Sequence, residues 1–220
     1  MAMISASILN GDLAHLADVA ETVAASGADA LHYDVMDGIF VNNLSFGLPV
    51  LSSLRPCTQL PIDVHLMIEE PHRYAERFAA AGADMISFHI ESRSDPSETI
   101  RLIHQCGIPA GIAVSPDTPA ETVFPLLTIL QPEDFILMMT VYPGQGGQAF
   151  MPQVLPKIRL LHEKITAEHL PLHIEVDGGI NAETGLLCRK AGADYLVAGS
   201  YLLGAEHPET AVSSLRAPFA

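Results

Sequence analysis

A repeated tripeptide sets the period of this chain. Gly-Ala-Asp occurs at residues 27–29, 82–84 and 192–194, each time after an alanine-rich helical stretch and before a short apolar stretch typical of a strand. The first two copies lie 55 residues apart and the last two lie 110 apart, and half of 55 is one eighth of the 220-residue chain. Eight strand–helix units of that length predict a closed parallel sheet, a (β/α)8 TIM barrel. We expect each glycine to end its helix in the left-handed conformation.

Length and composition agree with one barrel domain over residues 1–220, because 49% of the residues are hydrophobic and can fill a large core. No apolar run reaches the roughly 18 to 20 residues of a membrane span, and the N-terminus has no positive segment of a secretory signal. Three scattered cysteines indicate a reducing cytosol, so we expect a cytoplasmic protein. The net charge of −15 argues against nucleic acid, whose phosphates require Lys and Arg.

The strands are expected at residues 4–9, 31–38, 62–67, 85–89, 109–114, 135–140, 172–177 and 195–198. Helices are expected over 12–26 and from near 49, 71 and 181. Two more start at the capping sequences 95–98 and 118–121, and another follows the glycine loop and runs to about 168. Pro156 either starts or kinks the helix that ends near 168. The last helix must be short, because only about 20 residues follow the final strand.

Two of these strands carry polar residues on one face. Alternation places His32, Asp34 and Met36 together, with Leu31, Tyr33 and Val35 on the other side. Residues 62–67 repeat this pattern with Asp63, His65 and Met67. The active site of such a barrel lies at the carboxyl ends of its strands, where the expected polar residues are Ser7, His32, Asp34, His65, His89, Thr140 and Asp177.

Two imidazoles and two carboxylates, from His32, Asp34, His65 and Asp177, therefore converge from three strands. Such a set suits Zn²⁺, Fe²⁺, Mn²⁺ or Co²⁺, and the absence of thiolates disfavours a purely structural zinc site. The alternative is an ordinary core in which these groups bond to one another. No Lys or Cys stands at an expected strand end, so a Schiff-base nucleophile is missing.

Glycine-rich turns follow the last three strands. Glycines let backbone N–H groups approach an anion, and barrels often bind phosphate after strands 7 and 8. Each pair alone could be an ordinary turn, but three on one rim predict a phosphate cradle that lacks Arg and Lys. The residues are Gly144, Gln145, Gly146, Gly147, Gly178, Gly179, Gly199 and Ser200.

These motifs resemble the ribulose-phosphate 3-epimerases over nearly the whole chain. The matching segments are Ser-Ile-Leu at 7–9, His-Tyr-Asp-Val-Met-Asp-Gly at 32–38, Asp-Val-His-Leu-Met at 63–67, Met-Thr-Val at 139–141, the glycine loop at 143–148 and Glu-Val-Asp-Gly-Gly at 175–179. The resemblance implies one divalent metal ion held by His32, Asp34, His65 and Asp177. It also implies that Asp34 and Asp177 exchange protons with the sugar on opposite faces, and that the subunits form a dimer or a larger homo-oligomer.

The resemblance further implies that Ser7 contacts substrate and that Met36, Met67 and Met139 form an apolar wall around it, although methionines in these positions could simply fill the core. His65 would touch both the metal and the substrate. His89, Asp63 and Glu175 are expected to be orienting or structural groups.

The chain departs from the family pattern at the rim. Ala6 precedes Ser7, Ile39 and Asn42 stand where His and Pro are common, Tyr142 replaces an acidic residue, and Gln145 replaces Phe. The identity of the sugar phosphate therefore stays open. D-ribulose 5-phosphate to D-xylulose 5-phosphate is the first expectation, with D-allulose 6-phosphate as the alternative substrate. A metal-dependent lyase or decarboxylase and a non-catalytic sugar-phosphate binding protein are the other classes.

Overall fold

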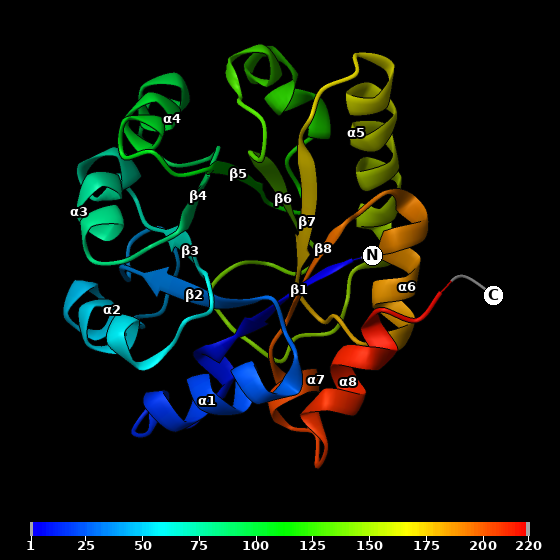
Figure 1. The fold of residues 1–220 in the computed structure, drawn as a ribbon. Coiled ribbons are helices and arrows are strands. Elements are labelled where there is room, and N and C mark those ends of the chain that lie inside the picture. The colour runs from blue at the N-terminus through cyan, green and yellow to red at the C-terminus, as the bar shows by residue number, and fades with distance from the viewer. Residues whose placement is uncertain (1, 219–220) are drawn as a thin grey trace.

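Eight parallel strands close into a barrel in the computed structural model, which describes residues 2–218 (Figure 1). Each strand pairs with its sequence neighbours, and the first strand pairs with the last. The predicted (β/α)8 fold is confirmed. The strands are β1 (Met3–Ser7), β2 (Ala30–Met36), β3 (Ile62–Met67), β4 (Met85–His89), β5 (Ala110–Val114), β6 (Phe135–Met139), β7 (His173–Asp177) and β8 (Tyr195–Ala198).

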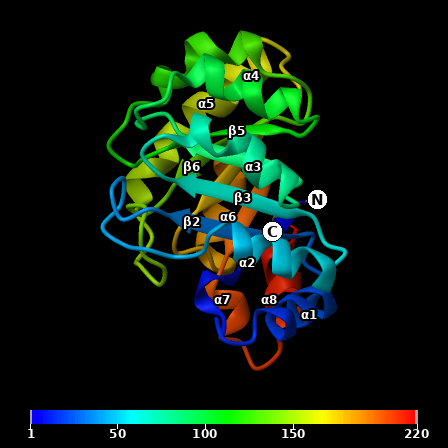
Figure 2. The same cartoon turned by 90° about the vertical axis from the view of Figure 1, so that its left-hand side faces the viewer.

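Helices surround the barrel, and Figure 2 shows α2 and α3 beside β2 and β3. The α-helices are α1 (Leu16–Ser26), α2 (Leu48–Leu54), α3 (Ala75–Ala80), α4 (Pro96–Gln105), α5 (Leu155–Ala167), α6 (Ala182–Ala191), α7 (Ser200–Leu203) and α8 (Pro208–Leu215). The 3₁₀ segments are η1 (Ile8–Asn10), η2 (Arg55–Cys57), η3 (Pro71–Arg73), η4 (Ala120–Ile129) and η5 (Pro152–Val154).

The repeated tripeptide ties neighbouring strands together. Gly27 and Gly192 end their helices with φ of +79° and +115°, as expected. The aspartate of each tripeptide lies just before the next strand, and its carboxylate accepts a hydrogen bond from a backbone N–H of the preceding strand. Asp29 accepts from Ile4, Asp84 from Ile62, and Asp194 from Ile174. Asp134 does the same for Ala110 without the Gly-Ala prefix. The 55-residue spacing is thus the spacing of every second strand.

Several expected elements differ from the structure. The strand expected over 4–9 ends at Ser7, where η1 begins, and the helix expected from near 71 starts as η3 before α3 begins. The helix predicted from residue 118 is the 3₁₀ segment η4, which contains Pro125, a residue that cannot supply the N–H of an α-helical hydrogen bond. The helix predicted from residue 12 begins at Leu16, because the Asp12 carboxylate accepts a hydrogen bond from the N–H of Ala14 and closes a turn instead. Pro156 lies in the first turn of α5, so it starts this helix.

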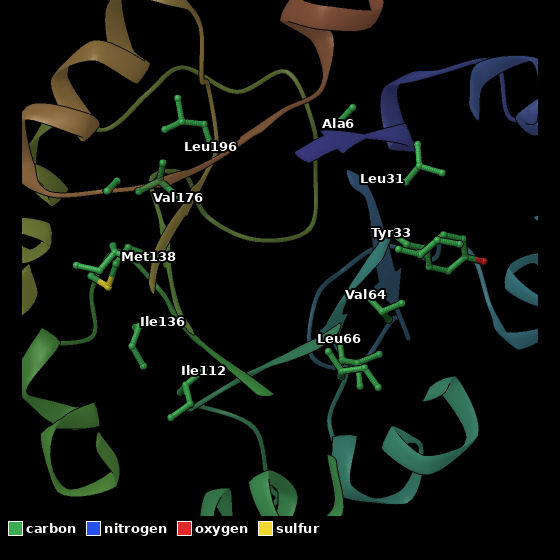
Figure 3. Packing of buried hydrophobic residues seen from close by; sticks show 14 of the residues in the cluster. Ala6, Leu31, Tyr33, Val64, Leu66, Ile112, Ile136, Met138, Val176 and Leu196 are labelled. Carbon is green, nitrogen blue, oxygen red and sulfur yellow. The ribbon is translucent and has the colours of Figure 1, made fainter. Parts of the chain in front are cut away.

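The strands bury two different surfaces. Leu31, Tyr33 and Val64 belong to the apolar layer between the strands and the helices, and they point away from the centre of the barrel in Figure 3. The opposite face of each strand fills the interior. This interior is apolar beside β5 and β6, where Phe135 and Leu137 pack together, and polar beside β1 to β4 and β7. The predicted alternation of faces in β2 and β3 is therefore correct.

Candidate active site

The four predicted ligands meet at the carboxyl end of the barrel. The register pairs Asp34 on β2 with His65 on β3, and His32 lies one pleat deeper. Asp177 reaches the same place from the end of β7. One ligand atom from each of His32, Asp34, His65 and Asp177 lies within 4.8 Å of every other, so this cluster could hold a metal ion.

His32 is held by a carboxylate behind it. Its Nδ1 lies 2.6 Å from Oδ2 of Asp63, and both side chains are fully buried. The other ring nitrogen, Nε2, lies 3.3 Å from Oδ1 of Asp34 but makes no hydrogen bond within the described residues. Although burial alone would lower it, the charges of Asp63 and Asp34 raise the pKa of His32 well above its usual value.

His65 shows the same arrangement with the opposite nitrogen. Its Nε2 lies 3.0 Å from Nε2 of His89, whereas its buried Nδ1 lies 3.4 Å from Oδ1 of Asp34 and has no hydrogen-bond partner among residues 2–218. Burial lowers the pKa of His65, which favours the neutral ring. Two buried imidazole nitrogens without partners therefore face one carboxylate.

The two catalytic candidates have pKa values shifted in opposite directions. Although burial alone would raise it, the charge of His32 and the close contacts with His32 and His65 hold the pKa of Asp34 below its usual range. Ser7 Oγ also donates to Asp34 at 2.7 Å. Desolvation raises the pKa of Asp177 to about 7; the charge of His32 opposes this shift, and the carboxylates of Asp34 and Asp63 reinforce it.

The donor set fits a divalent transition metal. An uncompensated nitrogen in the protein interior is costly, and a metal ion would satisfy His32 Nε2 and His65 Nδ1 together. The bond from His32 to Asp63 is of the kind that orients a metal-bound histidine. Below this cluster, His32, Asp63 and Glu175 form a second group whose ligand atoms also lie within 4.8 Å of one another. Burial and the charge of Asp63 raise the pKa of Glu175 well above its usual value, against the effect of His32.

Methionines line the pocket above the cluster. Met36 and Met67 pack with Val41, whereas Met139 belongs to the apolar half of the interior. The pocket contains most of the predicted substrate-binding residues, and His32 and His65 lie beneath it with no exposed surface. Its predicted lining residues are Ser7, Asp34, Met36, Met67, Met139, Gly144, Gln145, Gly146, Gly147, Asp177, Gly178, Gly179, Gly199 and Ser200.

Asn10 also lines this pocket, although it was not among the residues predicted from the sequence. A Cβ added to Gly146 would lie 2.6 Å from Asn10 Nδ2, and one added to Gly199 would lie 2.4 Å from Asn10 Oδ1. The amide therefore occupies the space between two glycine loops. Its place in a turn just after the first strand was the signal available in the sequence.

The rim substitutions fall into two groups. Tyr142 and Gln145 line the pocket, whereas Ala6, Ile39 and Asn42 do not. Tyr142 donates a hydrogen bond to Asp117, and the Gln145 carbonyl accepts one from the Gln148 side chain. Of the five departures from the family pattern, Tyr142 and Gln145 are those placed to affect a substrate directly.

Comparison with known proteins identifies the family. Residues 3–203 match the family model described as the ribulose-phosphate 3 epimerase family. The chain belongs to this family. It is 48% identical to a ribulose-phosphate 3-epimerase of Mycobacterium bovis over 214 residues, covering 97% of this chain and 91% of the relative. It is 45% identical to the enzyme of that name from Bacillus subtilis, covering 98% and 99%. The predicted family and the predicted carbohydrate epimerase are confirmed.

Solved structures support the fold. A structure titled KGPDC from Streptococcus mutans superposes with a TM-score of 0.71 at 13% identity, covering 98% of this chain and 96% of that one. At this identity the similarity concerns the barrel alone. Among the described residues, no helix is both long and apolar enough to cross a membrane.

Proposed function

We propose that this epimerase inverts C3 of a ketose phosphate, with D-ribulose 5-phosphate and D-xylulose 5-phosphate as its first pair of substrates. The observation that carries the proposal is the pair Asp34 and Asp177, two carboxyl groups in one pocket whose pKa values are shifted in opposite directions. A reaction that removes a proton and returns one needs such a pair of groups.

The geometry supports a two-carboxylate proton transfer. β7 and β2 stand three places apart in the closed strand order, so the two carboxyl groups enter the pocket from different sides. Ionised Asp34 can accept the C3 proton, which is acidic because it lies next to the C2 carbonyl. Asp177, whose pKa burial raises to about 7 in the metal-free protein, can hold a proton for the other face of the enediolate. The roles exchange for the reverse reaction, and each transfer contributes roughly 10²–10⁴-fold to the rate.

His32, Asp34, His65 and Asp177 would hold the metal ion. Zn²⁺, Fe²⁺, Mn²⁺ and Co²⁺ all suit these donors. When bound, a divalent ion would stabilise the negative charge that develops on the oxygens of the ketose. Because the pKa of metal-free His32 is raised, we expect metal binding to release a proton.

Other parts of the pocket would bind the rest of the substrate. Met36, Met67 and Met139 would exclude water from the reacting carbons. The backbone N–H groups of the glycine loops would bind the phosphate, since the pocket lining contains no Lys or Arg. Asn10 offers a further amide donor between the loops at Gly146 and Gly199.

The same chemistry on D-allulose 6-phosphate is the second candidate, because Tyr142 and Gln145 alter the lining of the pocket. The intact pair Asp34 and Asp177 speaks against a protein that only binds its sugar phosphate. A homo-oligomer and a cytoplasmic location remain part of this proposal. All three cysteines are free thiols, which suits a reducing compartment.

Incubating the metal-loaded protein with each ketose phosphate in heavy water tests the function. Epimerisation through an enediolate predicts deuterium at C3 of both epimers, fastest with the preferred substrate. Product without deuterium, or no reaction with either sugar, would contradict the proposed chemistry. A matched incubation after chelation of the metal should lose the exchange.

A further inference from the structure

A hydrogen-bonded series of side chains, called here the His65–Glu91 chain, leads from His65 through His89 and Glu91 to the loop after β5. His65 Nε2 lies 3.0 Å from His89 Nε2, and His89 Nδ1 lies 3.0 Å from Oε2 of Glu91. The rings of His65 and His89 are stacked, with their centroids 5.0 Å apart. Both imidazoles are fully buried, whereas the side chain of Glu91 is 26% exposed. The chain therefore runs from the proposed metal site toward the surface.

Burial favours the neutral imidazole, and when both buried rings are neutral, only one arrangement of protons satisfies every contact from His65 to Glu91. Two imidazole nitrogens 3.0 Å apart share one proton, so one ring donates and the other accepts. If His89 donated to His65 from Nε2 as a neutral ring, its bare Nδ1 would face the carboxylate of Glu91, and two acceptors would meet at 3.0 Å. If His65 donates instead, His89 Nδ1–H donates to Glu91 and every close contact is a hydrogen bond.

This arrangement decides which nitrogen of His65 is free. A neutral ring that donates from Nε2 has a bare lone pair on Nδ1, the atom that lies 3.4 Å from Asp34 Oδ1 and has no hydrogen-bond partner in the described part of the chain. The alternative tautomer would place a proton on Nδ1 and leave no lone pair for a metal ion.

Glu91 is fixed from its other side. Its Oε1 accepts a hydrogen bond of 2.9 Å from the backbone N–H of Ser115. Lys157 Nζ in turn donates to the Ser115 and Pro116 carbonyls at 2.9 and 3.0 Å. Although burial alone would raise it, the hydrogen bond from His89 lowers the pKa of Glu91 to about 2, so the carboxylate is an acceptor only.

We propose that Glu91 and His89 are positioning residues that hold His65 in the tautomer with a bare Nδ1, ready for the metal ion. The proposal rests on the proposed function for its metal, but the tautomer itself is a property of the metal-free protein. Phe40 covers the outer side of His89, with ring centroids 4.8 Å apart, and so helps to keep the second ring in place.

The experiment compares Glu91→Leu, Glu91→Gln and a control. Leucine removes the acceptor, whereas the Gln carbonyl oxygen can still accept from His89. Glu69→Leu is the matched control, because the side chain of Glu69 is 21% exposed, similar to that of Glu91. This substitution removes an ion pair with Arg93, which takes no part in the contacts of His65 and His89. Each metal-free protein is labelled with ¹⁵N-histidine, and the His65 signals are assigned by their loss in His65→Gln. Zn²⁺ affinity is measured by competition with a chromophoric chelator.

Wild type, Glu91→Gln and Glu69→Leu should show His65 protonated at Nε2 alone. Glu91→Leu should show a mixture of tautomers and bind Zn²⁺ about 10- to 100-fold more weakly. A wild-type His65 protonated at Nδ1 would overturn the proposal without use of any variant. So would Glu91→Leu with unchanged tautomer and affinity. A wild type with the expected tautomer that binds no Zn²⁺ would support the positioning role and contradict the proposed metal site.

Discussion

Replacement of Asp63 by Asn tests how the protein prepares His32. Asp63 lies behind the proposed metal site, fully buried, and its Oδ2 lies 2.6 Å from His32 Nδ1. Ser5 Oγ also donates to Asp63, at the longer distance of 3.4 Å. Asparagine keeps the shape and one carbonyl acceptor but removes the charge. The variant should therefore bind metal more weakly and keep the fold.

The expected loss of metal affinity follows from the hydrogen bond between His32 and Asp63. A hydrogen bond to a charged group contributes about 1.5–3 kcal/mol, and one between neutral groups contributes about 0.5–1.5 kcal/mol. The change from Asp63 to Asn should weaken the hydrogen bond that orients His32 by about 1–1.5 kcal/mol. Since about 1.4 kcal/mol is a factor of ten in affinity, Zn²⁺ should bind about tenfold more weakly.

The assay is a Zn²⁺ competition titration beside urea unfolding of the metal-free protein, and Asp134→Asn is the control. Asp134 is also buried, and its Oδ2 lies 2.7 Å from Nε2 of His104, far along the chain from the site. Both variants should lose stability without metal, but only Asp63→Asn should lose metal affinity. Equal Zn²⁺ affinity in Asp63→Asn and wild type, or an equal loss in the control, would refute this account of His32.

Three further outcomes are expected. Asp177→Asn should lower epimerisation and C3 exchange by roughly 10²–10⁴-fold, and near-normal turnover would remove Asp177 from the mechanism. In Gly199→Ala, the new Cβ would lie 2.4 Å from Asn10 Oδ1, so the KM for the sugar phosphate should rise about tenfold through loss of phosphate contacts. In the control Gly47→Ala, the atom nearest to the new Cβ is 3.8 Å away, so KM should not change. Equal KM values in the two variants would count against the phosphate cradle. A hydrogen bond to Asp194 raises the pKa of His173 above 6.5, against the effect of burial. This contact should stabilise the fold by about 0.5–1 kcal/mol below pH 6.5, and its contribution should fade as the pH rises above that value. The free energies of unfolding in urea of wild type and His173→Gln should therefore differ at about pH 5.5 and converge at about pH 8.5. A stability difference that grows with pH would contradict the predicted direction.

Much of the fold could be predicted because its periods are local. Alternation in β2 placed His32 and Asp34 on the inner face, and the Gly-Ala-Asp repeat gave the spacing of the units. Capping residues such as Asp95 mark a helix start wherever they occur, and Asp95 does accept the predicted hydrogen bond from the N–H of Glu98. The 3₁₀ segment η4 was missed because its start has the same capping signal, and Pro125 acts only further along.

The contacts between distant segments could not be predicted in this way. Asn10 lies beside Gly146 and Gly199 only because the barrel closes between β1 and β8. The role proposed for Glu91 depends on the distance between two rings from neighbouring strands, which no spacing in the sequence reports. The convergence of His32, Asp34, His65 and Asp177 could be predicted because a strand end in a barrel already fixes where a side chain lies.

The central claim is that side chains from β2, β3 and β7 bind one metal ion. Anomalous diffraction from crystals grown with Zn²⁺ or Co²⁺ tests it most directly. The account predicts a single strong peak in contact with His32 Nε2, His65 Nδ1 and the carboxylates of Asp34 and Asp177. A peak elsewhere, or no peak at these four side chains under saturating metal, would contradict it.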